Sequence, residues 1–99
     1  MSAPRRDEVL DILRHHKAEF ADIFGVTSLG VFGSVARDEV SEESDVDIVF
    51  ETDTPNLLRT AMIKQRIEAL LCRHVDVIRW RGSINPRLKA RIAREACYV

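Results

Sequence analysis

The stretch GSVARDEVSEESDVDIVF, residues 33–50, places two carboxylates in a segment that otherwise has the composition of a buried strand. Its apolar residues near the end predict a strand over residues 45–51. Because side chains alternate along a strand, Asp45 and Asp47 share one face, roughly 7 Å apart. A strand of so small a protein is expected to present apolar side chains to a core. These two carboxylates therefore need a partner outside the core.

The rest of the chain supplies the elements around this strand. Apolar residues at helical spacing predict a first helix, with His16 and Ile23 on its inner face. Thr54-Pro55 and Asn85-Pro86 read as helix starts, a capping side chain followed by proline. The predicted helices cover residues 5–24, one or two turns within 34–39, 54–72, and a last helix from 85 onward. The predicted strands cover residues 26–32, 45–51 and 74–80.

Connection lengths limit the topology. The link of about ten residues between the first two strands is too short for a parallel crossover, so these strands are expected to be antiparallel. The link to the third strand carries a helix, which predicts a parallel, right-handed crossover. The expected fold class is α/β (α+β), a mixed sheet of about three strands flanked by about four helices. This layout brings Gly33, Ser34, Asp45, Asp47 and Asp76 to one edge of the sheet.

Composition bounds the function. The 99 residues, with 45% hydrophobic content, fit a single domain, residues 1–99. No apolar run approaches the length that spans a bilayer, and the first residues lack the apolar core of a signal peptide, so a cytoplasmic location is expected. A net charge of −1 argues against a general nucleic-acid surface. Cys72 and Cys97 are expected to be reduced thiols buried in helices.

Asp45, Asp47 and Asp76 require a cation among them. Each pair of bare carboxylates repels by about 2 to 3 kcal/mol at an effective dielectric near 20. An arginine or a divalent metal would relieve this repulsion, and oxygen ligands favour Mg²⁺. Two such ions, about 3.5 to 4 Å apart, clamp the attacking and leaving oxygens in phosphoryl transfer. Gly33, Ser34 and Arg37 would then bind phosphate.

Each piece has a simpler interpretation when it stands alone. Gly33-Ser34 is then a turn, Asp45 and Asp47 mark a solvated strand, and Asp76 pairs with Arg79 or Arg37. The order of the pieces is more specific than any one of them: Gly-Ser, ten residues, Asp-x-Asp in an apolar strand, and a third Asp after a crossover helix.

With these residues the sequence resembles the nucleotidyltransferase superfamily that includes DNA polymerase beta. It resembles more narrowly the minimal nucleotidyltransferases, the MntA-type antitoxins paired with HEPN-domain toxins. The likeness lies in GSVARDEVSEESDVDIVF and in the ending INPRLKARIAREACYV, while the order of elements extends it over nearly the whole chain. Asp38 stands where family members commonly carry glycine.

The resemblance implies a mechanism. Asp45 and Asp47 would hold Mg²⁺ on the phosphates of ATP. Asp76 would complete a second metal site and help deprotonate the attacking hydroxyl. Gly33 and Ser34 would bind the outer phosphates as pyrophosphate leaves. The implied acceptor is a tyrosine hydroxyl of a partner HEPN-type ribonuclease toxin, which AMP transfer would silence within a hetero-oligomer.

Two rival functions stay open. In the first, the chain is an antitoxin that neutralises its toxin by binding alone. In the second, it is a nucleotidyltransferase that modifies a small molecule or an RNA end. The last helix, with Arg87, Lys89, Arg91 and Arg94, either docks a partner or forms a solvated face. Trp80, between Arg79 and Arg81, either caps the core, which is the favoured interpretation, or stacks on a base. His16 is expected to pack against the core, while His15 and His74 lie on the surface.

Overall fold

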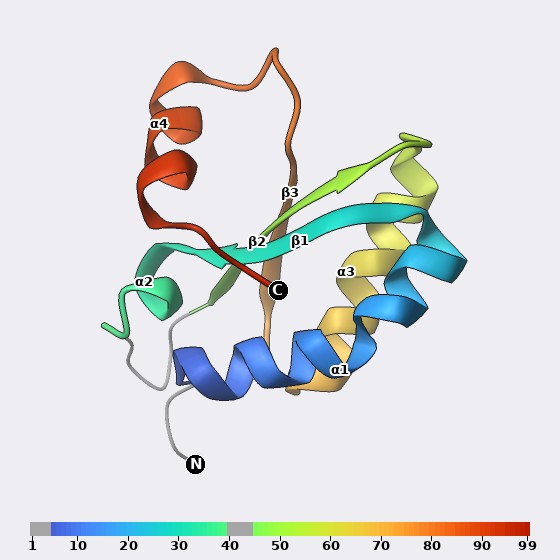
Figure 1. The fold of residues 1–99 in the computed structure, drawn as a ribbon, viewed down its shortest axis with the longest axis horizontal. Helices are drawn as coiled ribbons and strands as arrows, with labels where there is room; N and C mark the ends of the chain where they lie inside the picture. The colour runs from blue at the N-terminus through green and yellow to red at the C-terminus, as the bar shows by residue number, and fades with distance from the viewer. Residues whose placement is uncertain (1–4, 40–44) are drawn as a thin grey trace.

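Helices and strands alternate along most of the chain. The computed structural model describes residues 5–39 and 45–99. The elements, in chain order, are α1 (Arg6–Phe24), β1 (Val26–Phe32), α2 (Gly33–Ala36), β2 (Val46–Thr52), α3 (Leu57–Leu71), β3 (Val75–Arg79), α4 (Pro86–Glu95) and β4 (Cys97–Tyr98). The strands form one sheet in the order β3-β2-β1-β4 (Figure 1). The expected fold class is confirmed, and β4 is a strand that the sequence pattern does not predict.

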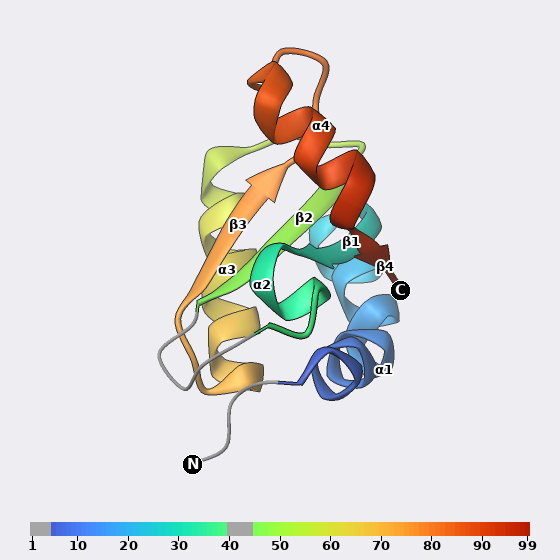
Figure 2. The ribbon, with the colours of Figure 1, turned by 90° about the vertical axis from the view of Figure 1, so that its left-hand side faces the viewer.

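Strand directions follow the connection lengths. β1 and β2 are antiparallel, and β2 and β3 are parallel, as expected. The register pairs Asp47 with Phe32 on one side and with Asp76 on the other. The end of β1 and the starts of β2 and β3 therefore meet at one edge of the sheet (Figure 2).

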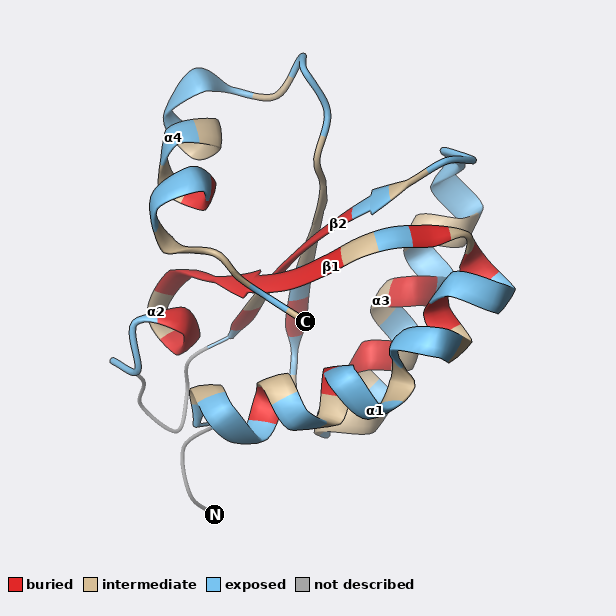
Figure 3. Cartoon of the chain, viewed as in Figure 1, coloured by how far each residue is buried: buried red, intermediate tan, exposed pale blue. Residues whose placement is uncertain are grey.

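The larger core lies between the sheet and the helices α1 and α3. Ile48 and Phe50 of β2 point into it and are almost completely buried against Phe20 of α1 and Ile67 of α3. Red segments on the inner sides of both helices and along β1 and β2 mark this layer in Figure 3. Because even-numbered residues of β2 fill this core, the odd-numbered ones face the other side of the sheet.

A smaller core lies on that other side, beneath α4. Phe32, Val49 and Ile92 form its buried centre. Trp80 packs against it, as predicted, and Lys89 Nζ lies 5.7 Å from the centroid of the Trp80 ring. This packing holds α4 over the face of the sheet that carries the acidic residues.

The start of α3 differs from the prediction. The helix begins at Leu57 instead of Thr54, because Asn56 caps it: its Oδ1 accepts hydrogen bonds from the backbone N–H groups of Leu58 (2.8 Å) and Arg59 (3.2 Å). The Asn85 cap and Pro86 at the first turn of α4 confirm the second predicted start.

Three burial predictions are wrong. Ile23 is 59% exposed, since Phe24, one residue further round the helix, takes the inward position beside Phe20. Cys72 is exposed at the left-handed C-cap of α3. Cys97 is half-buried in β4, because α4 ends at Glu95.

His16 is half-buried on α1, and His15 and His74 are exposed, as expected. Within residues 5–39 and 45–99, none of the helices combines the length and the apolar character needed to cross a bilayer.

Candidate active site

Three carboxylates from two neighbouring strands share the sheet face beneath α4. Asp47 pairs in register with Asp76, and in a parallel pair such residues point to the same side. Asp45 precedes β2 by one residue and lies two residues before Asp47, so it faces the same way. The structure therefore brings together the three acids that the sequence analysis singled out. Residues 40–44, part of the acidic spacer between the motifs, lie outside the described residues.

His74 joins this group from the residue before β3. Ligand atoms of Asp45, His74 and Asp76 all lie within 4.8 Å of one another, and all three residues are exposed. His74 Nδ1 is 3.4 Å from an Asp45 carboxylate oxygen. From the sequence alone, His74 is expected on the surface, with no role in the site. Its spacing of two from Asp76 was the available signal, since it puts both side chains on one face of the strand.

Asp47 is the most enclosed of the three carboxylates. Burial raises its pKa, the nearby Arg91 guanidinium opposes the rise, and the negative charges of Asp76 and Asp45 add to it. The charged form of Asp47 is therefore unfavourable even with Arg91 nearby, because the arginine offsets burial and the like charges only in part. Oxygen donors from three aspartates, with one imidazole beside them, fit a hard divalent ion such as Mg²⁺.

Gly33 brings the backbone directly under Asp47. Its φ of +77° lies in the left-handed region that favours glycine. A Cβ at this position would collide with the Asp47 carboxylate and would lie 3.1 Å from Arg91 Nη2. The Gly33-Ser34 turn therefore packs against the acidic group, as the sequence analysis expected, and Ser34 follows it half-buried.

Glu95, in the last turn of α4, holds two arginines beside this turn. One carboxylate oxygen accepts a hydrogen bond from Arg37 Nη1 at 2.6 Å, and the other accepts one from Arg91 Nε at 3.1 Å. Only 10% of the Glu95 side chain is exposed. Burial opposes its ionisation, but the two guanidinium hydrogen bonds outweigh this effect and lower the pKa of Glu95.

Arg37 and Arg91 consequently differ in their surroundings. Arg37 also donates to Glu39 at 3.2 Å, and its bonds to the two glutamates raise its pKa. Arg91 spans the space between Glu95, the Asp47 carboxylate and the ring of Phe32, whose centroid is 5.6 Å from its guanidinium carbon. From the sequence alone, Arg91 is predicted only as part of a basic helix. No local pattern marks it, because α4 must fold back over the sheet to place it here.

Comparison with known proteins assigns the family. The sequence pattern of the nucleotidyltransferase domain matches residues 13–99. The chain belongs to the nucleotidyltransferase domain family. It is similar to the protein adenylyltransferase MntA of Thermococcus cleftensis, with 38% identity over 94 residues and 94% of each chain covered.

Solved structures extend the likeness to the fold of this nucleotidyltransferase. A solved minimal nucleotidyltransferase is 34% identical to it, with a TM-score of 0.76 and 95% of each chain covered. A complex of a tri-AMPylated Shewanella oneidensis HEPN toxin with an MNT antitoxin contains a chain of the same fold. That match has a TM-score of 0.60 at 19% identity and covers 94% of this chain and 66% of the other.

The charges of this nucleotidyltransferase site fall on two sides. Asp45 and Asp76 form an acidic side toward β3, while Arg91 and Arg37, whose charges Glu95 balances in part, form a cationic side next to the end of β1. Asp47 lies between the two sides. Such an arrangement suits a reaction at phosphorus, in which one side binds phosphate charge and the other activates a hydroxyl.

Proposed function

We propose that this nucleotidyltransferase is a Mg²⁺-dependent protein adenylyltransferase that acts as an antitoxin. It transfers AMP from ATP to a tyrosine hydroxyl of a partner HEPN-type ribonuclease toxin. The observation that carries the proposal is the placement of Asp45, Asp47 and Asp76 on one sheet edge, with Asp47 against the backbone of Gly33. The MntA relative, named a protein adenylyltransferase, and the tri-AMPylated toxin complex support the acceptor class.

The aspartates form the metal-binding part of the proposed site. Asp45, Asp47 and Asp76 would hold two Mg²⁺ ions. Mg²⁺ bound there would neutralise phosphate charge and would stabilise the ionised form of the attacking hydroxyl. The half-buried Asp47, with its raised pKa, is the carboxylate whose charge such binding relieves most.

The donor phosphates lie along the cationic side in this proposal. Backbone N–H groups and the Ser34 hydroxyl, at a turn that Gly33 keeps free of a side chain, bind the outer phosphates. Arg91 reaches the same place and donates to a phosphate oxygen. Glu95 fixes the Arg91 guanidinium through its Nε, which leaves the terminal N–H groups for phosphate. Arg37 contributes to the position of this phosphate-binding group, because it donates a hydrogen bond to the same Glu95 carboxylate.

The reaction is a displacement at the α-phosphorus. The tyrosine oxygen forms a bond to this phosphorus, while the bond to the bridging oxygen of the β-phosphate breaks. The hydroxyl proton passes to the Asp76 carboxylate and then to solvent. Pyrophosphate leaves with the bonding electrons, and Arg91 and Ser34 stabilise its charge.

Intact mass spectrometry of a HEPN-domain toxin mixed with this chain tests the proposal. After incubation with ATP and Mg²⁺, the partner is expected to gain the mass of one or more adenylyl groups. Asp47→Asn should abolish the gain without dissociating the complex. Asp22→Asn, an exposed aspartate on α1, is the control for loss of one negative charge and should keep full transfer.

The other outcomes identify the rival functions. An unmodified partner in a stable complex, with toxicity neutralised equally by wild type and Asp47→Asn, would establish neutralisation by binding alone. Transfer of label from α-labelled ATP to RNA or to a small molecule, and none to protein, would replace the acceptor class. Either result would overturn the proposal.

A further inference from the structure

β3 is an outer strand of the sheet, and among the described residues no strand pairs with its outer side. This open edge runs along the length of β3 and differs from the sheet edge that carries the carboxylates. It pairs with β2 alone. The His74 carbonyl accepts a hydrogen bond from Val46 N–H at 3.2 Å, and Trp80 N–H donates to the Phe50 carbonyl at 2.8 Å. Because residues of a parallel strand alternate in the direction of their polar groups, the backbone N–H and C=O of residues 77 and 79 point away from β2.

Val75, at the start of β3, supports this direction. Its N–H, which is also directed outward, donates to a Glu68 carboxylate oxygen at 3.1 Å, so α3 covers the first outward position. Val77 and Arg79 are left as the outward-facing residues of the strand. Their backbone groups can pair with an extended peptide laid along the edge.

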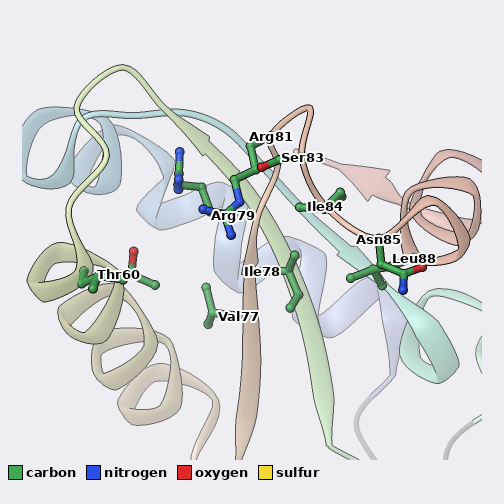
Figure 4. Close-up of a pocket in the computed structure, with 10 residues that line it drawn as sticks. Thr60, Val77, Ile78, Arg79, Arg81, Ser83, Ile84, Asn85 and Leu88 are labelled. Carbon is green, nitrogen blue, oxygen red and sulfur yellow. The ribbon is translucent and has the colours of Figure 1, made fainter.

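A groove of about 390 Å³ lies along this edge, between the start of α3 and the start of α4 (Figure 4). Apolar side chains of Val77, Ile78, Ile84 and Leu88 line it. Leu57 extends the apolar surface at the start of α3 and is 91% exposed. Thr60, Ser83 and Asn85 line the groove as well, and a groove that is partly apolar and lies beside unpaired strand groups fits a peptide better than it fits nucleic acid.

Two arginines give the groove its charge. Arg79 and Arg81 line it, and no acidic residue does so among the described residues. Neither arginine has an ion-pair partner within residues 5–39 and 45–99, whereas Arg37, Arg66 and Arg91 each bind a glutamate. The groove therefore complements a segment that carries both acidic and apolar side chains.

The groove lies next to the acidic side of the catalytic site. Asp76, the carboxylate proposed to take the proton of the acceptor, precedes Val77 on the same strand. The groups proposed to bind the donor phosphates lie on the opposite side, at the end of β1. An acceptor that approaches along β3 therefore reaches Asp76 without crossing the donor.

We propose that the open edge of β3 and its groove dock the acceptor segment, an extended acidic stretch of the partner protein that adds as a strand beside residues 77–79. Its acidic side chains pair with Arg79 and Arg81, its apolar side chains fill the groove, and its hydroxyl-bearing residue lies at the Asp76 end. This inference rests on the proposed function, because it names the surface that presents the acceptor to the same site.

Hydrogen exchange of the complex with the HEPN-domain partner tests docking independently of catalysis. The amides of Val77 and Arg79 are expected to become protected when the partner binds. Exchange that is unchanged at these amides, with protection only elsewhere on the chain, would overturn the inference. Because this readout requires no AMP transfer, it separates failure of docking from failure of the proposed function.

Kinetics supply the second test. Arg79→Glu/Arg81→Glu is expected to raise KM for the partner about tenfold or more, with kcat and the affinity for Mg²⁺–ATP retained. Arg14→Glu/Lys17→Glu makes the same charge change on α1 and should leave KM unchanged. Leu57→Asp, at a highly exposed position, gives a variant that does not threaten folding and should also raise KM. An unchanged KM in both groove variants would refute the inference.

Discussion

Gly33 combines a left-handed backbone with a close contact to the Asp47 carboxylate. Gly33→Ala is expected to lose about 1 to 3 kcal/mol of stability from backbone strain, and to lose AMP transfer because the new methyl group displaces Asp47. Chemical denaturation and the mass assay measure the two effects. Gly82→Ala is the matched control, since a Cβ there meets open space. Equal behaviour of the two variants would contradict this account.

Arg91 is the second residue whose role can be tested alone. Arg91→Ala should raise KM for ATP by about tenfold to a hundredfold, the value of one charged hydrogen bond of about 1.5 to 3 kcal/mol. Arg94→Ala removes an exposed guanidinium from the same helix and should change KM little. Nucleotide titrations and steady-state kinetics on both variants measure the difference. A KM for ATP that stays at the wild-type value in Arg91→Ala would assign the phosphate to other groups.

At the scale of elements, the cap of α3 offers a direct comparison between sequence pattern and structure. Asn56→Ala removes the side chain that binds two N–H groups of the first turn and should cost about 1 kcal/mol of unfolding free energy. Thr54→Ala, at the cap that the sequence pattern suggested, should cost less, because Thr54 Oγ1 binds only the side chain of the half-buried Arg59. Urea unfolding of both variants decides between the two positions.

Elements with a strong periodic pattern are the ones that the sequence predicts well. The three longer strands lie within one residue of their predicted ranges, since alternation is a local property of the chain. β4 has two residues and no periodicity, so only its pairing with Gly30 and Val31 of β1 defines it. A second cap-like residue two positions after Thr54 explains the misplaced start of α3.

The residues of the candidate site also differ in how well the sequence predicts them. Asp45, Asp47 and Asp76 follow from strand alternation and from connection lengths, both of which are readable in the sequence. Arg91 enters the site only through the packing of α4 on Phe32 and Val49, a long-range contact without a local signal. His74 is readable by its spacing of two from Asp76, which places both side chains on one face of the strand.

For the molecule as a whole, the site carboxylates have opposite effects on stability and on function. Their mutual repulsion lowers the stability of the fold when no cation is bound, and the same charges are what the proposed function requires. The carboxylates repel one another on a sheet edge that packs against α4. A bound cation would relieve this repulsion, and the relief would favour tight binding. The same edge separates donor from acceptor: phosphate groups are expected beside β1, and the acceptor beside β3. In the proposed function, a domain this small would handle two substrates on opposite sides of the start of β2.

This opposition predicts the pH dependence of stability. The pKa of Asp47 is raised in the folded protein, so the folded state binds its proton more tightly than the unfolded state does. Stability from this group is fully present below the ordinary aspartate pKa of about 3.9 and is lost as pH rises through the folded value. Without Mg²⁺, Asp47→Asn should therefore be more stable than wild type at pH 7, and the difference should vanish at pH 3.

Binding of Mg²⁺–ATP should reverse the order of stability, so that wild type becomes more stable than Asp47→Asn. Mg²⁺–ATP at about a hundred times its Kd stabilises wild type by about 2.7 kcal/mol, and Asp47→Asn should gain far less. Thermal unfolding with and without Mg²⁺–ATP, at pH 7 and with Asp22→Asn as the control, measures both halves of the prediction. If Asp47→Asn were less stable than wild type in the absence of the ligand, Arg91 would already compensate the Asp47 charge in the empty site. The cation would then be needed for chemistry alone, because the fold would carry no repulsion for it to relieve.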